Sequence, residues 1–170
     1  MKQKRPSTHR DSTRASEPLL TPRKASVLVV DDSSDGREML VEYLAFRGFQ
    51  VSEARHGAEA IEATRRVHPH IILMDLTMPA MDGWEATRQL KADPLTKEII
   101  IIAVSAHAFA SEQASAREAG CDGFIAKPFD LAVLADVLAR VMSKGLAGLD
   151  PKAATLEGAL RPRPSKLRTL

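Results

Sequence analysis

The sequence predicts an α/β fold, with a five-stranded parallel sheet and helices on both faces. Between residues 25 and 144, short apolar runs alternate five times with segments whose apolar residues recur at helical spacing. Several runs are continuous rather than alternating, which is typical of parallel strands buried on both faces. The connections are short, so each strand–helix–strand unit should cross over in the right-handed sense.

The first half of this region predicts three strands and two helices. The run at 27–30 reads as a buried strand, 50–54 alternates like a more exposed edge strand, and 71–74 is the third. Gly48 and Pro69 are expected to stop the two helices between them. The helical apolar positions are Met39, Leu40, Tyr43 and Leu44 in the first helix, and Ala58, Ile61 and Thr64 in the second.

The second half predicts two more strands, at 99–104 and 123–126. A helix over Glu112–Ala119 is rich in alanine and has a weak apolar face, so we expect it to be the least firmly held. Asp130 is expected to cap the last, strongly amphipathic helix. The inward positions are Trp84, Thr87 and Leu90 in the third helix, and Leu131, Leu134, Val137, Leu138 and Val141 in the last.

Three carboxylates follow two of the predicted strands. Five strands of this kind suggest the flavodoxin-like order 2-1-3-4-5, in which the ends of strands one and three flank the switch point where ligands bind. Asp31, Asp32 and Asp75 fall at these two ends. Since neighbouring strands lie about 4.8 Å apart, the like charges either raise their pKa values or hold a cation. Hard oxygen ligands favour Mg2+.

The charge of the chain is unevenly distributed. Residues 25–144 carry 12 Lys/Arg and 18 Asp/Glu, whereas residues 1–24 and 145–170 are basic, at net +5 and +3. Both ends lack apolar periodicity and are expected to be disordered or flexible tails, with a helical turn or two within Ala153–Leu160. The tails could attract nucleic acid in a non-specific, salt-sensitive way. No helix-turn-helix pattern is visible, so specific nucleic-acid binding is not expected.

The sequence also bears on the compartment. A single cysteine, Cys121, cannot form an internal disulfide and fits a reducing environment. No apolar stretch approaches the roughly 18 residues needed to span a bilayer, and the N-terminus lacks the apolar region of a secretory signal. A cytoplasmic protein without membrane contact is therefore expected.

Two further residues complete the constellation at the strand ends. Ser105 ends the fourth strand, and Lys127, followed by Pro128, ends the fifth. Together with the three carboxylates they resemble the receiver domain of two-component response regulators, of the chemotaxis-regulator type. The segments 73–83 and 123–129 are similar to the receiver's phosphorylation loop and lysine loop. The resemblance covers about residues 25–144, so a stand-alone, single-domain receiver is expected.

The resemblance implies a role for each carboxylate. Asp75 would accept a phosphoryl group from a sensor histidine kinase or a phosphotransfer protein. Asp31 and Asp32 would hold Mg2+, Asp32 more directly, with Asp75 and the backbone carbonyl of Thr77 as further ligands. The protein would then be a phosphorelay switch and not a turnover enzyme, catalysing only its own phosphorylation and dephosphorylation.

The resemblance also implies roles for the residues around the phosphoryl group. Lys127 would pair with a phosphoryl oxygen, across a Lys127–Pro128 bond expected to be cis. Ser105 would donate its hydroxyl to the same group, and Phe124 would swing inward behind it as the switch aromatic. Thr77 and His107 occupy positions that tune phosphoryl lifetime in the family. The output surface would be helix four, strand five and helix five, which could bind a target or form a homodimer.

Simpler interpretations exist for each residue. The Asp31–Asp32 pair could cap a helix, Asp75 could be a solvated loop carboxylate and Lys127 a surface lysine. Ser105 could be a small strand-end residue, Phe124 a plain core aromatic and His107 a solvent-facing loop histidine.

Two rival functions also remain. One is a phosphorylation-independent pseudo-receiver, which the intact acidic set disfavours. The other is a Mg2+-dependent phosphohydrolase acting through Asp75. Those enzymes usually place an acid two residues after the nucleophile, where this chain has Thr77.

Overall fold

The computed structural model describes residues 25–78, 82–107 and 109–149. The expected tail at 1–24, the helical turns within 153–160 and the rest of 150–170 lie outside these residues. The five strands form one parallel sheet in the order β2-β1-β3-β4-β5, which confirms the predicted fold and places β2 at an edge. The strands are β1 (Ser26–Val30), β2 (Gln50–Ala54), β3 (Ile71–Asp75), β4 (Ile100–Ser105) and β5 (Gly123–Ala126).

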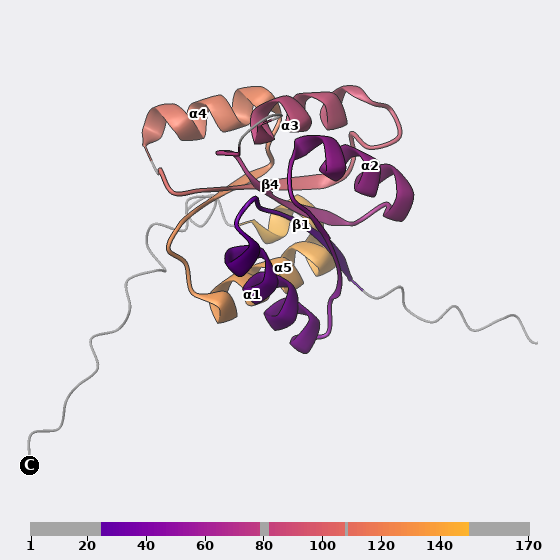
Figure 1. Cartoon of the computed structure of the whole chain (residues 1–170), viewed down its shortest axis with the longest axis vertical. Coiled ribbons are helices and arrows are strands. Elements are labelled where there is room, and N and C mark those ends of the chain that lie inside the picture. The colour runs from indigo at the N-terminus through magenta and orange to yellow at the C-terminus, as the bar shows by residue number, and fades with distance from the viewer. Residues whose placement is uncertain (1–24, 79–81, 108, 150–170) are drawn as a thin grey trace, which may run out of the picture.

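Helices cover both faces of the sheet (Figure 1). One face carries α1 (Ser34–Phe46) and α5 (Leu131–Lys144), which pack with the sheet in one apolar cluster. The other face carries α2 (Gly57–Val67), α3 (Gly83–Ala92) and α4 (Ala110–Ala119), which pack in a second cluster. The two clusters divide each strand's side chains alternately, as the pleat requires.

The register of the sheet brings the ends of four strands to one edge. Val30 of β1 pairs with Met74 of β3, so Asp31 and Asp75 each directly follow a paired position. Asp75 itself pairs with Val104, and the next residue, Ser105, pairs with Ala126 immediately before Lys127. The parallel alignment therefore gathers all the expected site residues at the carboxyl edge.

The helix ends differ in how they are capped. The Asp130 carboxylate accepts hydrogen bonds from the backbone N–H groups of Ala132 (2.7 Å) and Val133 (3.1 Å), as predicted for the start of α5. At the start of α4, Phe109 makes no capping hydrogen bond with its side chain. This helix is thus held less firmly at its first turn than α5.

Two apolar helix positions lie at the surface, and one predicted boundary was wrong. Met39 is 51% exposed and Ala58 is also exposed, whereas Leu131 is half-buried against the α1/α5 cluster, as expected for an inward position. The fold also continues beyond the expected start of the tail at 145. A 3-10 turn at Gly145–Gly148 brings Leu149 against the α1/α5 cluster.

Glycine allows this last turn to pack. A Cβ on Gly148 would lie 2.5 Å from the backbone oxygen of Arg140, so only glycine fits there.

Across the described ranges, no helix is both long and apolar enough to cross a membrane.

Candidate functional site

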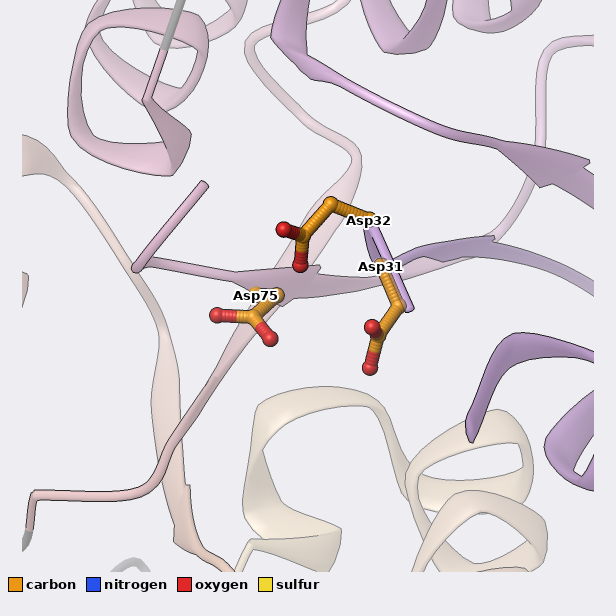
Figure 2. A group of neighbouring side chains, drawn as sticks. All are labelled: Asp31, Asp32 and Asp75. Atoms are coloured by element: carbon orange, nitrogen blue, oxygen red, sulfur yellow. The ribbon is translucent and has the colours of Figure 1, made fainter. Parts of the chain in front are cut away.

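Three carboxylates converge at the carboxyl edge of the sheet. Asp31, Asp32 and Asp75 each present an oxygen, and these oxygens all lie within 4.8 Å of one another (Figure 2). Asp31 and Asp75 are only 3% and 7% exposed, whereas Asp32 is exposed. The pair of buried acids thus forms the floor of the site, with Asp32 at its solvent side.

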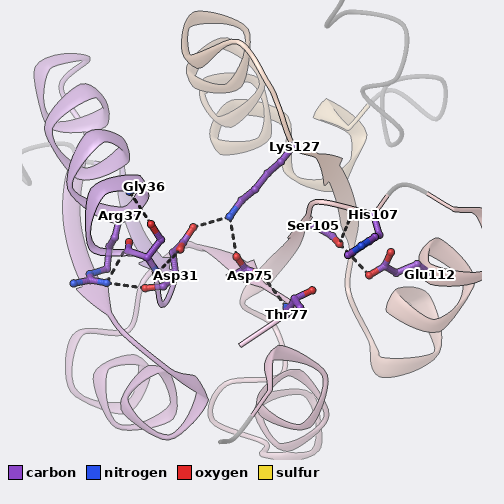
Figure 3. A network of polar contacts seen from close by, with 10 residues as sticks. Asp31, Gly36, Arg37, Asp75, Thr77, Ser105, His107, Glu112 and Lys127 are labelled. Atoms are coloured by element: carbon purple, nitrogen blue, oxygen red, sulfur yellow. Dashed lines mark hydrogen bonds and ion pairs between the residues drawn. The ribbon is translucent and has the colours of Figure 1, made fainter. Parts of the chain in front are cut away.

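Lys127 bridges the two buried acids. Its Nζ lies 2.8 Å from Asp31 Oδ2 and 2.8 Å from Asp75 Oδ2 (Figure 3). Partial burial of the ammonium acts to lower the pKa of Lys127. The hydrogen bonds and attraction from Asp31 and Asp75 outweigh this and hold its pKa above the usual value. Lys127 is therefore fully charged at neutral pH.

The loops after β1 and β3 fix the other oxygen of each buried acid. The backbone N–H of Ser33 donates to Asp31 Oδ1, and that of Thr77 donates to Asp75 Oδ1, both at 2.8 Å. Each acid thus has one oxygen held by its own loop and one held by Lys127. Asp31 and Asp75 therefore have the same pair of hydrogen-bond partners, a loop N–H and Lys127, and lie side by side at the carboxyl edge of the sheet.

Arg37 was missed by the sequence analysis. It lies on α1, and its guanidinium donates to the backbone oxygen of Asp31 at 2.8 Å and pairs with Glu53 on β2 at 3.0 Å. Its side chain is only 12% exposed. The signal available in the sequence was an arginine one helical turn past an acidic pair, whose side chain can reach back to that loop.

Gly83 was also missed as a site residue. A Cβ on Gly83 would overlap the backbone oxygen of Asp75, so the first turn of α3 lies directly against the end of β3. Asp82 caps this helix by accepting from Glu85 N–H at 2.8 Å. The Asp82–Gly83 pair, a capping residue followed by the smallest residue, was the signal.

Ser105 is fully buried and turned toward α4 rather than toward Asp75. Its hydroxyl donates to Glu112 Oε1 at 3.0 Å and accepts the backbone N–H of His107 at 3.1 Å. Figure 3 shows these contacts as a group separate from the one around Lys127. Glu112 had no predicted role, because its contact depends on how α4 folds back over the end of β4.

The remaining expected residues lie around this edge. Thr77 and His107 are exposed, and the His107 ring stacks on Phe109 with centroids 6.4 Å apart. Phe124 is 6% exposed and packs in the α2–α4 cluster, so its ring already faces inward. The Lys127–Pro128 peptide bond is cis, as expected.

The acidic cluster suits a hard divalent cation. Its three side chains supply only oxygen ligands, the donor type that Mg2+ prefers. The exposed Asp32 leaves one side of the cluster open to solvent. The residues therefore fit a magnesium site, with Asp31, Asp32 and Asp75 as the protein carboxylates.

The fold and this edge define a signalling domain of the response regulator class. Residues 27–139 match the family described as the response regulator receiver domain. The chain belongs to this family, which serves two-component signalling.

Its relatives agree with this assignment. The polar-differentiation response regulator DivK of Brucella ovis is 33% identical over 106 residues, which cover 62% of this chain and 86% of DivK. The crystal structure of the chemotaxis protein CheY4 of Vibrio cholerae is 29% identical, with a TM-score of 0.66, over 69% of this chain and 98% of CheY4. A receiver domain of a histidine kinase from Syntrophus aciditrophicus is 33% identical, with a TM-score of 0.65, over 70% of this chain and 90% of that one.

Proposed function

We propose that Asp75 accepts a phosphoryl group from a sensor histidine kinase or a phosphotransfer protein, and that the protein switches its interactions as a result. The observation that supports this is the placement of Asp75. Its carboxylate is buried at a strand end, oriented by Thr77 N–H and held by Lys127 at 2.8 Å. A carboxylate fixed in this way is suited to nucleophilic attack on phosphorus.

The transfer step is a displacement at phosphorus, in which the Asp75 carboxylate replaces the donor's imidazole. One oxygen of Asp75 forms a bond to phosphorus, the bond from phosphorus to the donor's imidazole nitrogen breaks, and that electron pair leaves with the imidazole. Lys127, released from Asp75 Oδ2, pairs with a phosphoryl oxygen. Thr77 N–H continues to orient the carboxylate.

We propose Mg2+ as the cofactor. Asp31, Asp32 and Asp75 would hold it, with the backbone carbonyl of Thr77 as a further ligand. When bound, Mg2+ supplies charge that offsets repulsion between the anionic donor and the carboxylates. Arg37 contributes by holding the backbone that carries Asp31.

Signalling would follow from the added charge. A phosphoryl group brings about −1.5 to −2 charges and strong acceptors to the strand edge, where Ser105 can donate its hydroxyl to it. Phe124, on the neighbouring strand, pairs with Ala103 two residues before Ser105, and its buried ring would be the switch aromatic. The output face would be α4, β5 and α5, which could engage a protein target or a second copy by shifting an existing equilibrium.

Two details belong to the same proposal. Thr77 and His107 are exposed beside the site and would tune how long the phosphoryl group lasts. We expect the protein to act in the cytoplasm and to catalyse only its own phosphorylation and dephosphorylation, with no turnover of small substrates.

The test is phosphorylation by a small donor. The full chain would be mixed with acetyl phosphate and Mg2+ and weighed as the intact protein, beside Asp75→Asn and the control Asp136→Asn, an exposed acid on α5. The parent and the control should gain one phosphoryl group and Asp75→Asn none. If the parent binds Mg2+ yet gains no mass, a phosphorylation-independent module replaces this proposal. Sustained phosphate release would indicate a phosphohydrolase.

A further inference from the structure

The Ser105 hydroxyl has a single proton, and Glu112 holds it. The donor–acceptor distance is 3.0 Å, and Ser105 is fully buried, so no water competes for that proton from the solvent side. A serine hydroxyl donates one hydrogen bond. Bonds to charged acceptors are the stronger ones. In the unmodified protein, Ser105 is thus committed to α4.

A phosphoryl group on Asp75 would demand the same proton. Two anions that contact one hydroxyl oxygen at hydrogen-bond distance lie within about 6 Å of each other. At this separation and with little intervening solvent they repel. The Glu112 carboxylate and the phosphoryl group therefore compete for Ser105 and cannot both be well accommodated.

The helix that carries Glu112 is suited to respond. Of α4, only Ala116 and Ala119 are buried, so little apolar surface fixes it to the sheet. Phe109 at its N-cap provides no side-chain hydrogen bond. The bond from Ser105 to Glu112 links the end of β4 to the first turn of this lightly held helix.

We propose that Glu112 is a positioning residue that holds Ser105 away from Asp75 until phosphorylation. When Ser105 then leaves Glu112, the first turn of α4 loses its bond to β4 and changes in response to the phosphoryl group. This inference rests on the proposed function. On phosphorylation, Ser105 would transfer its hydrogen bond from Glu112 to a phosphoryl oxygen, and Glu112 would turn to solvent. No covalent bond changes in this step.

The consequence is that Glu112 opposes the phosphorylated form. Removing its carboxylate should make that form easier to reach without touching Asp31, Asp75 or Lys127. Glu112→Ala removes both the acceptor and the charge. Glu112→Gln keeps an acceptor oxygen and removes only the charge, so it should have a smaller effect. Glu118→Ala removes an exposed carboxylate from the same helix and serves as the matched control.

The experiment is a titration of the full chain with beryllofluoride, a mimic of the aspartyl-phosphate, in the presence of Mg2+. Trp84, half-buried at the start of α3 beside the Asp75 loop, provides the fluorescence signal. Glu112→Ala should bind beryllofluoride about tenfold more tightly than the parent, which corresponds to losing one hydrogen bond to a charged group. Glu118→Ala should stay within about twofold, as expected for an exposed charge.

Ser105→Ala separates this role from a merely structural one. If Glu112 acts through Ser105, Glu112→Ala should not change beryllofluoride affinity in the Ser105→Ala background. The Mg2+ affinity, measured without beryllofluoride, should stay the same in every variant, since Glu112 does not contact the acidic cluster.

Each other outcome is decisive. Equal affinities for the parent and Glu112→Ala would overturn the positioning role while leaving phosphorylation intact. Tighter binding that persists in the Ser105→Ala background would show a general charge effect and overturn it as well. A parent that binds Mg2+ but neither beryllofluoride nor acetyl phosphate would overturn the proposed function and this inference together.

Discussion

The two faces of the sheet are packed with different kinds of side chain. On the α1/α5 face, the helices bury mainly leucine and valine, including Leu44 and Leu138, both fully buried. On the α2–α4 face, most of the buried helix positions are alanines, and the larger side chains come mainly from the strands. Large helix side chains therefore stabilise the packing of the α1/α5 face, whereas the helices on the α2–α4 face can move at a lower cost in free energy because they bury less apolar surface.

The contrast is sharpest between α5 and α4, which follow and precede β5. Five residues of α5 are buried and Asp130 caps its start, whereas α4 buries two alanines and has no side-chain cap. The firmly packed α5 and the lightly packed α4 thus lie on opposite faces of the same strand. The site residues lie at the edge where these two faces meet.

The largest expected effect on the free energy of unfolding comes from the α1/α5 face. Leu138→Ala should lower the free energy of unfolding by about 2–5 kcal/mol, because Leu138 is fully buried and the truncation leaves a cavity. Urea denaturation followed by circular dichroism measures this. A loss below about 1 kcal/mol would mean that the α1/α5 face can collapse around the gap, and the contrast between the faces would fail.

The next effect concerns the edge between the faces. Lys127→Met should lower the free energy of unfolding by about 1–2 kcal/mol without added metal, because Asp31 and Asp75 then face each other unpaired, with part of the cost relieved by solvent. Asp32, which no described contact joins to Lys127, supplies the comparison as Asp32→Asn. That variant should be at least as stable as the parent, since it removes a like charge.

The pH dependence of the Lys127→Met effect follows from the raised pKa of Lys127. A group whose pKa is higher in the folded state contributes stability fully below its unfolded pKa, about 10.4 for lysine, and loses it as the pH rises through the folded value. The difference between parent and variant should be constant from pH 7 to 9 and shrink above about 10.4. A difference that grows with alkaline pH would contradict the ion pairing.

A smaller effect should distinguish α4 from α5 directly. Ala116→Gly and Ala135→Gly remove the same methyl group from buried positions on α4 and α5. Each should cost about 1 kcal/mol. Amide hydrogen exchange is expected to accelerate within α4 alone for Ala116→Gly, but across the whole domain for Ala135→Gly. Domain-wide acceleration in both would show that α4 opens only with the rest of the fold.

The smallest effect concerns the chemical reactivity of Cys121, which lies directly after α4. Burial raises the pKa of Cys121 to about 11. At pH 8 its thiolate fraction is therefore about a hundredfold below that of an ordinary thiol. Iodoacetamide should modify the native protein slowly, and faster in Ala116→Gly, because Cys121 N–H bonds to the Ala116 carbonyl at the end of α4. Rapid labelling of the parent would show that this side is already open.

Much of the fold could be predicted because strands are marked by local patterns of apolar residues. The continuous apolar runs, the alternating edge strand β2 and the acids at strand ends led to the observed order and to the gathering of Asp31, Asp32, Asp75, Ser105 and Lys127 at one edge. Their roles in phosphorylation stay predictions. The boundary at 145 was wrong, because it depends on how tightly the last turn packs against α5.

Side-chain partners across loops could not be predicted in the same way. Arg37 reaches Asp31 and Glu53, and Glu112 reaches Ser105, only because helices fold back over strand ends. The spacing of Glu112 does not distinguish it from an ordinary surface charge, and the place of Arg37 soon after the acidic pair shows only that it could reach back to that loop. Gly83 is similar, since its need for glycine arises from the approach of the Asp75 backbone.

The ion pairs of Lys127 with Asp31 and Asp75 have a consequence for the folding of the chain during its synthesis. Lys127 lies 96 residues after Asp31 and 52 after Asp75 along the chain. A nascent chain that has not yet emerged from the ribosome as far as β5 holds its acids without their lysine. Newly made protein thus gains the complete cluster of acids and lysine only once the last strand is in place.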